Sequence, residues 1–583
     1  MTYPTKVEID GALRAFALRK VSNLNRPLLK DQVNGVHRLI QLGRKDGSTL
    51  FYGDTGVGKT IQAIVASAFL AAEGNRRVLI LAPSTAVLRE RWKEDLDEFE
   101  KAIREANELP NPPSWASKLS TLQTVRADVK SLPTTTASSP QIWLGTTPTM
   151  ANVTKGATRN PLGHRKRWIE KLHPCLVVID EAHMRTGEDT STRDTMETLL
   201  KGLRLLSLTA TPVSQHAKSL QQIVNLNGGG KWAEDVTEYQ VEVHHAVRTW
   251  WASGGQTEIT KPKVDRAVRS KGPATAAFKE NVVRQKPRAT KQTEPKKIRV
   301  QVEEDGDWIK GYGLARILPA LLVADERVEG RDRETSVSPS DAYRRMLLSS
   351  PAAFWSSAVA KTLLRKTMPE WKTIQKDMGA LLGAHGSKVL GAEQLKHPKI
   401  RWTVTNGLKQ AQGRQVLIFV QYLETIKALV SAIKFEAEYL GSSVTVGSAS
   451  DKGDVTRFRN ESKGGILVAS PRHSMGLEFD RNHPNGEKNR LLICHDLPWS
   501  AVMLQQQVGR LRRASNGFPE IDAKAPILEI PDDLRVHATV MGRWNVAEIV
   551  DIQGGFAGGS DDAGVQGLPD SFPAEFVDRL RLQ

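Results

Sequence analysis

The chain has 583 residues, and its 82 Lys and Arg outnumber its 65 Asp and Glu to give a net charge of +17. This length exceeds what one hydrophobic core supports, so we expect several domains, and the basic excess favours nucleic acid as a partner over a charge that serves solubility alone. The sequence contains no apolar run of 18 residues and no hydrophobic N-terminal signal, which argues against a membrane protein or a secreted one and predicts a cytoplasmic location.

The N-terminal part predicts two helices, a strand and a third helix. A short helix is expected at 12–20 within an extension of residues 1–24, and an amphipathic helix at 25–42. The apolar stretch 48–52 predicts a buried strand, and the Ala-rich stretch 61–70 predicts a helix.

Between that strand and that helix lies a match to the phosphate-loop pattern G-x-x-x-x-G-K-[ST]. Its glycines allow backbone N–H groups to curl around a phosphate, and the following helix N-terminus adds partial positive charge. We expect the lysine to reach the β- and γ-phosphates of a nucleotide and the threonine to hold Mg²⁺. The residues of the loop are Gly53, Asp54, Thr55, Gly56, Val57, Gly58, Lys59 and Thr60.

Further along, short apolar stretches alternate with helical patterns. Strands are predicted at 77–83, 142–147, 176–180 and 205–212, whereas 107–140, rich in Pro, Ser and Thr, resembles a surface excursion. Continuous apolar strands that alternate with helices indicate a parallel sheet covered on both faces.

Asp180 and Glu181 follow the strand at 176–180, about 120 residues after the phosphate loop. An acid at the carboxyl end of a neighbouring strand can hold the Mg²⁺ of a bound nucleotide, which is the role expected for Asp180. Glu181 is placed to orient and deprotonate the attacking water. In a parallel sheet both motifs face one crevice, so we expect ATP and Mg²⁺ to bind there.

The pattern changes between 226 and 395, where residues 261–300 hold 13 Lys or Arg against 3 acids. Strands then return at 415–420, 443–446, 465–469 and 490–494, and 551–583 begins with a Gly-rich stretch that resembles a flexible tail. The expected organisation is an extension at 1–24, a first lobe at 25–225, a basic helical insert and linker at 226–395, a second lobe at 396–550 and the tail at 551–583.

The order of these motifs resembles superfamily 2 helicase-like ATPases. Gln32 stands where that family keeps an adenine-reading glutamine, and Leu81–Thr85 with Trp92 resemble a segment that touches nucleic-acid backbone. Residues 180–183, Asp-Glu-Ala-His, match its Walker B box, and 209–212, Thr-Ala-Thr-Pro, match its coupling box. Residues 506–513 match Q-x-x-G-R-x-x-R, and the resemblance implies that Arg510 and Arg513 reach ATP from the second lobe. It also implies an α/β fold of two RecA-like parallel-sheet lobes.

Several stretches resemble the Snf2-like branch of that superfamily, especially its RapA-like members. They include the acidic residue Asp54 in the phosphate loop and the segments 282–288, 345–353, 397–400 and 495–500. Residues 474–480 resemble a nucleotide- and backbone-contacting box that includes Gly476, although Glu478 stands where the family usually has Asn or Asp.

These features lead to three functional hypotheses. The first is an ATP-driven translocase on duplex DNA that displaces or remodels bound protein, and the second is a strand-separating helicase of DNA or RNA. The third is an ATPase subunit of a larger complex with protein partners, for example in restriction or phage defence.

Overall fold

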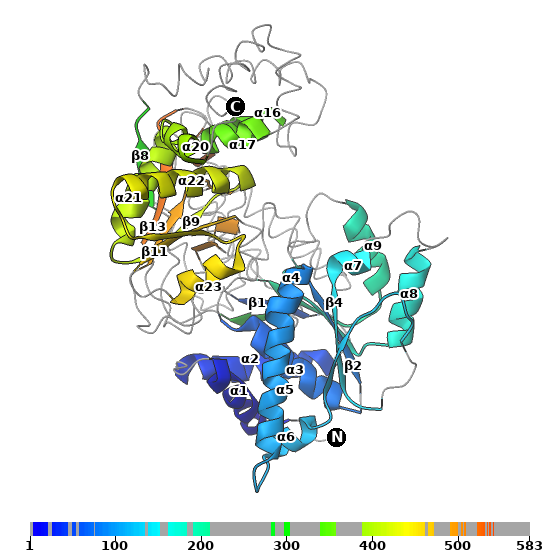
Figure 1. Ribbon diagram of the computed structural model, residues 1–583. Coiled ribbons are helices and arrows are strands. Elements are labelled where there is room, and N and C mark those ends of the chain that lie inside the picture. Colours follow the sequence, from blue (N-terminus) through cyan, green and yellow to red (C-terminus); the bar gives the residue numbers. More distant parts are fainter. Residues whose placement is uncertain are drawn as a thin grey trace, which may run out of the picture. The chain divides into compact units, whose positions relative to one another are not determined.

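The computed structural model describes the chain in segments: 4–20, 26–44, 49–53, 57–74, 76–133, 138–151, 161–182, 190–209, 282–285, 296–302, 339–356, 387–460, 464–470, 490–498 and 522–530, with the single positions or pairs 503–504, 507–508, 533, 536–537 and 540. The described residues up to 285 belong to one compact unit, the first lobe, and those from 296 onward belong to another, the second lobe. Each lobe is described by itself (Figure 1).

The first lobe is built on a parallel sheet of seven strands in the order β3-β4-β2-β5-β6-β1-β7. Its central strands are apolar and buried along their whole length, as a parallel sheet covered on both faces requires. The strands are β1 (Thr49–Gly53), β2 (Arg77–Ala82), β3 (Gln123–Arg126), β4 (Gln141–Thr146), β5 (Leu176–Ile179), β6 (Leu205–Thr209) and β7 (Val282–Gln285).

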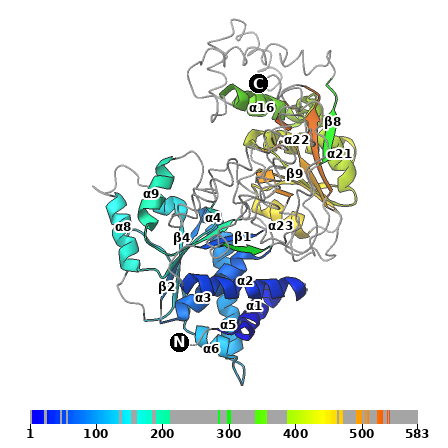
Figure 2. The ribbon, with the colours of Figure 1, turned by 180° about the vertical axis from the view of Figure 1, so that it is seen from behind.

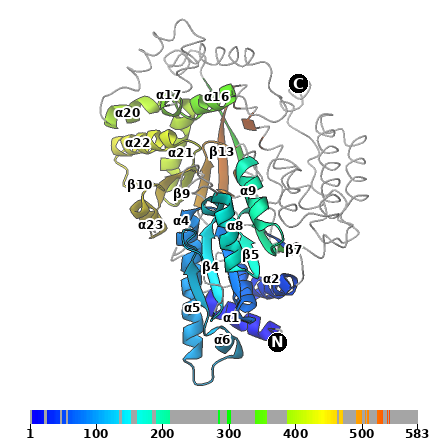
Figure 3. The ribbon, with the colours of Figure 1, turned by 90° about the vertical axis from the view of Figure 1, so that its right-hand side faces the viewer.

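Helices cover both faces of this sheet. On one face of the sheet, helix α3 packs against β2 and β4, and α1 and α2 pack against α3. On the opposite face, α9 packs against α7 and α8 (Figures 2 and 3). The described helices of this lobe are α1 (Lys6–Lys20), α2 (Arg26–Arg44), α3 (Lys59–Ala72), α4 (Thr85–Val87), η1 (Leu88–Lys93), α5 (Glu94–Asn107), α6 (Ser114–Leu119), α7 (Thr147–Ala151), α8 (Pro161–Leu172) and α9 (Thr190–Leu200).

The second lobe repeats this architecture with a parallel sheet of six strands in the order β10-β11-β9-β12-β13-β8. Its strands are β8 (Lys296–Val300), β9 (Gln415–Phe419), β10 (Thr445–Ser448), β11 (Gly465–Ala469), β12 (Arg490–Cys494) and β13 (Asp522–Leu528). Its described helices are α16 (Pro339–Ser349), α17 (Pro351–Ser356), α20 (Ser387–Gln394), α21 (Pro398–Ala411), α22 (Leu423–Tyr439) and α23 (Lys452–Asn460). The predicted fold class, two RecA-like parallel α/β lobes, is confirmed.

Helix α21 shows how local sequence places an element of this lobe. Its N-cap is His397, whose side chain accepts from the Ile400 N–H, and Pro398 occupies the first turn, where a missing N–H carries no penalty. Its apolar face, with Ile400 and Val404, joins β9, β11 and α22 in one core cluster.

Three strands lie in stretches for which the sequence did not predict a strand. Residues 282–285 and 296–300, within the basic stretch predicted to lie between the lobes, form the edge strand of the first and the second sheet, respectively. Strand β3 lies in the stretch predicted as a surface excursion and forms the opposite edge of the first sheet. Edge strands tolerate polar and basic side chains, so their patterns do not resemble the apolar central strands.

Buried polar groups meet at the carboxyl ends of β9 and β12. The Asp496 carboxylate accepts from the Gln421 N–H (2.9 Å) and from the Ser349 hydroxyl (2.7 Å). Ser349 in turn contacts the Thr425 hydroxyl at 2.8 Å, so α16 and α22 share this carboxylate.

Both ring nitrogens of His495, the residue before Asp496, lie within hydrogen-bond distance of a partner. Its Nε2 lies 3.0 Å from the Ser349 carbonyl and its Nδ1 lies 2.8 Å from the Thr403 hydroxyl. A carbonyl can only accept, so Nε2 carries the proton and Nδ1 accepts from Thr403. Burial lowers the pKa of His495, which keeps the ring neutral in this network.

Candidate nucleotide-binding site

The phosphate loop connects β1 to α3, as predicted. Gly58 precedes α3 in the left-handed region, with φ of 80°, which disfavours any residue with a side chain. A Cβ at this position would also lie 2.5 Å from the Gln32 Nε2 atom. The backbone conformation therefore favours glycine at the second glycine of the pattern, and a side chain there would also displace the Gln32 amide.

Lys59 and Thr60 open helix α3 and are both buried, with exposed fractions of 9% and 3%. The Lys59 ammonium group donates to the carbonyl oxygen of Gly53, and Gly53 is the last residue of β1. The lysine thus spans the loop from its end to its beginning.

Two buried glutamines hold the outer side of this loop. The Gln32 side-chain amide, from α2, donates to the Val57 carbonyl at 3.0 Å. The Gln62 amide, from α3, donates to the same carbonyl at 3.1 Å and lies 3.3 Å from the Gly58 carbonyl. Gln32 was predicted from the family resemblance to contact a nucleotide, whereas Gln62 was not predicted.

Asp180 and Glu181 follow β5 directly. The Asp180 N–H donates to the Leu81 carbonyl at 3.0 Å, which continues the pairing of β5 with β2. Glu181 has φ of 50°, a left-handed conformation that costs a non-glycine residue on the order of 1 kcal/mol. Its N–H donates to the Asp180 Oδ1 atom at 3.0 Å, which fixes the strained turn against the carboxylate.

Asp180 is held on its other oxygen by Trp92. The indole N–H donates to Oδ2 at 2.8 Å, and the Trp92 side chain is fully buried. A buried ring cannot lie against nucleic acid, so the predicted backbone contact is excluded for Trp92 itself. Its structural role is to orient the acid.

The electrostatics of Asp180 link it to the phosphate loop. Burial, and then the neighbouring charge of Glu181, raise the pKa of Asp180 above its ordinary value, while Arg91, the Trp92 hydrogen bond and Lys59 oppose that rise. Lys59 is therefore close enough to Asp180 for their charges to interact. The structure brings together the two motifs that the sequence separates by about 120 residues. Carboxyl groups with shifted pKa values are typical of functional sites.

The side chains present suit a magnesium ion. Mg²⁺ prefers hard oxygen ligands and is usually held by one or two protein groups together with substrate phosphates. The Asp180 carboxylate and the Thr60 hydroxyl, each at the carboxyl edge of the same parallel sheet, are such oxygens. The raised pKa of Asp180 also fits, because a cation beside a buried carboxyl favours its ionised form.

Several predicted site residues lie outside the described part of the chain. They are Asp54, Thr55 and Gly56 of the phosphate loop, Gly476, Glu478, Arg510 and Arg513. His183, Gln506 and the last three residues of the box at 209–212 also lie outside it. The roles predicted for all of them stay predictions.

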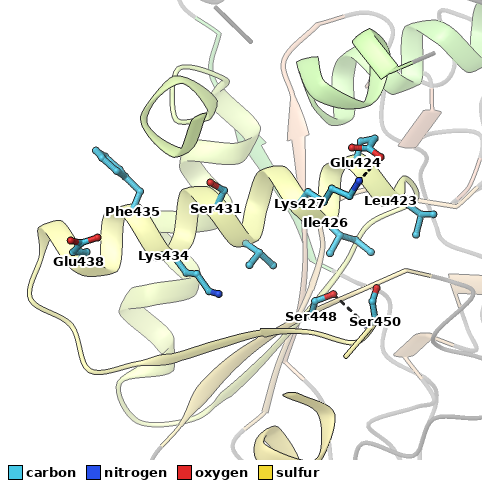
Figure 4. Close-up of a pocket in the computed structure, with 11 residues that line it drawn as sticks. Leu423, Glu424, Ile426, Lys427, Ser431, Lys434, Phe435, Glu438, Ser448 and Ser450 are labelled. Carbon is cyan, nitrogen blue, oxygen red and sulfur yellow. Dashed lines mark hydrogen bonds and ion pairs between the residues drawn. The ribbon is translucent and has the colours of Figure 1, made fainter. Parts of the chain in front are cut away.

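A separate pocket lies in the second lobe, along α22 (Figure 4). Its volume is about 670 Å³, and Ser448 and Ser450 face α22 from the end of β10. Apolar side chains such as Ile426 and Val430 line it, and Lys427 at its rim is paired with Glu424 at 2.9 Å. None of the described residues predicted to bind nucleotide lines this pocket.

Three features of the site escaped the sequence analysis: Arg91, Gln62 and the Trp92–Asp180 bond. Arg91 and Trp92 lie on η1, a π-helical turn between α4 and α5, and such turns are frequent at functional sites. The only expectation for Trp92 was that its segment touches nucleic-acid backbone, and no sequence pattern pairs it with Asp180.

Residues 25–214 match the family model described as type III restriction enzyme, res subunit. No curated protein matches the chain significantly in sequence.

Among solved structures, the Pyrococcus furiosus Hef helicase domain aligns with 15% identity and a TM-score of 0.40, covering 88% of this chain and 99% of its own. The Sulfolobus solfataricus SWI2/SNF2 ATPase core in complex with dsDNA aligns with 15% identity and a TM-score of 0.32, covering 92% and 95%. The same core domain in another structure aligns with 13% identity and a TM-score of 0.32, covering 96% and 95%. The fold assignment rests on the strand order of the two sheets.

Proposed function

We propose that this chain is a superfamily 2 helicase-like ATPase that hydrolyses ATP to translocate on duplex DNA and thereby displaces or remodels bound protein; the order of its motifs and the family model that matches residues 25–214 support this proposal. The observation that carries the ATPase part is that Lys59, which opens the helix after β1, and the buried acid Asp180, which follows β5, lie at the carboxyl edge of one parallel sheet. A phosphate-binding lysine beside a buried acid is the arrangement that phosphoryl transfer uses.

Each residue of the site has a chemical role in this proposal. Lys59 leaves the Gly53 carbonyl to contact the β- and γ-phosphates, and its positive charge offsets theirs. Thr60 and Asp180 would hold Mg²⁺, which when bound neutralises charge that develops on the transferred phosphoryl group. Glu181 accepts a proton from the attacking water, and its backbone N–H, which donates to the Asp180 Oδ1 atom, fixes the turn that follows β5.

Arg510 and Arg513 complete the site in this proposal. The support is their position in the box at 506–513, since arginine carries a permanent charge on a planar fork that suits a phosphoryl transition state. Gln32 reads the base, and Gly476 and Glu478 contribute contacts from the second lobe.

The proposal of duplex DNA as the track rests on charge and on the Snf2-like stretches. The net charge of +17 and the basic run at 261–300 favour binding to phosphate backbone, which does not depend on base sequence. Such contacts release counterions, so DNA-stimulated hydrolysis should fall steeply as salt rises.

One observation favours a second candidate. The family model that matches residues 25–214 is named for the res subunit of a type III restriction enzyme. The chain would then be the ATPase subunit of a larger complex, and its hydrolysis would depend on a partner protein.

The test pairs ATP turnover with an assay of movement. Turnover is measured with duplex DNA, single-stranded DNA, RNA and no nucleic acid, and displacement of a triplex-forming strand is compared with unwinding of a forked duplex. We expect duplex DNA to stimulate most and the triplex strand to be displaced. Stimulation by single strands with unwinding of the fork would favour a strand-separating helicase. Hydrolysis that no nucleic acid stimulates would favour the subunit candidate.

A further inference from the structure

Gln62 is a fully buried polar residue at the phosphate loop that the roles above leave unused. It lies on α3, three positions after Lys59, with an exposed fraction of 0%. Burial of an amide is costly unless its N–H groups find acceptors. Here the side-chain nitrogen lies 3.1 Å from the Val57 carbonyl and 3.3 Å from the Gly58 carbonyl.

These two carbonyls determine where two backbone N–H groups point. In a planar trans peptide the C=O of one residue and the N–H of the next point in opposite directions, and the structure contains no cis peptide among the described residues. Holding the Val57 carbonyl toward Gln62 therefore turns the Gly58 N–H away from it. Holding the Gly58 carbonyl does the same for the Lys59 N–H.

Backbone N–H groups at this point of a phosphate loop form the cradle for an anion. The Gly58 carbonyl also accepts from the Gln62 backbone N–H at 3.0 Å, so Gln62 fixes that peptide plane through its main chain and its side chain. Gln32 donates to the Val57 carbonyl from α2, on a different helix. Gln62 acts on both peptide planes, whereas the Gln32 hydrogen bond acts on the Val57 carbonyl.

We propose that Gln62 is a positioning residue for the triphosphate: by holding the Val57 and Gly58 carbonyls, it aims the Gly58 and Lys59 N–H groups at the phosphates. This inference rests on the proposed nucleotide site. It assigns Gln62 to the phosphates and Gln32 to the base, so the two glutamines differ in the part of the ligand that they affect.

The test replaces Gln62 by methionine, which keeps the length of the side chain and removes its donors. Dissociation constants of the full chain are measured with Mg²⁺ for ATP, GTP and inorganic tripolyphosphate, which has no base. Loss of a neutral hydrogen bond changes an equilibrium about 3- to 10-fold. We expect Gln62→Met to weaken binding of all three ligands by the same factor in that range, with the ratio of ATP to GTP affinity unchanged.

Gln32→Met provides the contrast, and Gln41→Met provides the matched control. Gln32→Met should weaken ATP more than tripolyphosphate. Gln41 lies on α2 and is half-buried away from these carbonyls, so its replacement should change none of the three affinities. The melting temperature of each variant separates loss of the cradle from loss of the fold.

If Gln62→Met melts below the assay temperature, Gln62→Glu is used, which keeps the shape but places an acceptor against two carbonyl oxygens. The Gln62→Glu variant should lose more tripolyphosphate affinity than the Gln62→Met variant. Tripolyphosphate binding equal to wild type in a folded variant overturns the role of Gln62, as does a loss confined to ATP. Absence of ATP binding by the wild-type chain overturns the nucleotide site itself, and with it this role.

Discussion

The two lobes have the same parallel α/β architecture but use the carboxyl ends of their strands differently. In the first lobe, the ends of β1 and β5 carry Lys59, Asp180 and Glu181, and burial raises the pKa of Asp180. In the second lobe, the ends of β9 and β12 carry Asp496 and His495; Oδ2 of Asp496 and both ring nitrogens of His495 make hydrogen bonds to the helices and loops of that lobe.

This difference indicates that the same sheet edge can serve ligand binding in one lobe and stability in the other. Buried charges are costly unless they are paired or a ligand completes them. In the first lobe, Lys59 and Asp180 are buried at the proposed nucleotide site, whereas in the second lobe Lys399 is buried against Asp533. Mutually satisfied groups at the same place join α16, α21 and α22 to the second sheet. Substitutions in the first set should therefore change turnover, and those in buried pairs of the second lobe should change stability.

Among the substitutions outside the phosphate loop, the largest effect is expected from Arg510→Ala and Arg513→Ala. Each should lower ATP turnover on the order of 10³-fold or more, because a phosphoryl transition state loses a fixed positive charge, with a smaller loss of ATP affinity. Such a result would show that the box at 506–513 contributes to the chemistry. A variant with normal turnover would remove that arginine from the site.

Glu181→Gln should keep ATP binding and lower turnover by about 10²- to 10⁴-fold, because the amide cannot accept the proton of the attacking water. Fluorescent-nucleotide affinity and turnover are measured on the same preparation. Glu105→Gln, on the exposed side of α5, is the matched control and should behave as wild type. Turnover within a few-fold of wild type would exclude Glu181 as the base.

Lys399→Ala should act on stability. The Lys399 ammonium lies 2.6 Å from the Asp533 carboxylate, and the two side chains are 3% and 8% exposed. Removing one partner leaves a buried charge unpaired, which costs about 3–5 kcal/mol. Denaturant unfolding measures this loss, with Lys409→Ala, exposed on the same helix, as the control. A loss equal to that of the control would show that the pair does not stabilise the second lobe.

Trp92→Phe tests whether the indole N–H holds down the pKa of Asp180. Because the indole N–H stabilises the ionised carboxylate, its loss should raise the pKa of Asp180 further. A protonated Asp180 cannot hold Mg²⁺, so activity falls as pH decreases through that pKa. The acid limb of the kcat/KM profile should therefore move to higher pH, and turnover near neutrality should fall about 3- to 10-fold. An unmoved acid limb would contradict this role.

The smallest effect is expected at Glu8, which joins α1 to α6. Burial disfavours its charge, but hydrogen bonds from Lys118, the Thr5 N–H and Ser114 outweigh that cost and lower the pKa of Glu8 to about 2. A lowered carboxyl pKa stabilises the fold above the unfolded value of 4.5, and this stabilisation is lost as pH falls toward 2. Glu8→Gln should therefore flatten the acid dependence of the melting temperature between those values. A curve parallel to wild type would contradict the shift.

Much of the fold was predictable because its signals are local. The strand at 49–53, the loop around Lys59 and the strand ending at Asp180 each follow from apolar runs and spacing. The edge strands β7 and β8 were not predicted, since both lie within a basic stretch that is typical of a solvated linker, and each pairs with a strand far away in sequence, β1 and β13.

The candidate site divides in the same way. Lys59, Thr60, Asp180 and Glu181 are fixed by motif, whereas the bond from Trp92 to Asp180 joins residues 88 positions apart through the packing of η1 against the sheet. The left-handed backbone of Glu181 is equally invisible to sequence patterns, because nothing in the residue type requires it.

The central claim is that nucleic-acid-dependent ATP hydrolysis takes place at the phosphate loop of the first lobe. The most direct measurement is ATP turnover by the full chain with and without duplex DNA, for wild type, Lys59→Ala and the control Lys101→Ala, which removes an exposed lysine of α5. We predict stimulation by DNA in wild type and in Lys101→Ala, and no turnover above background in Lys59→Ala. DNA-stimulated turnover near the wild-type rate in Lys59→Ala would contradict the claim.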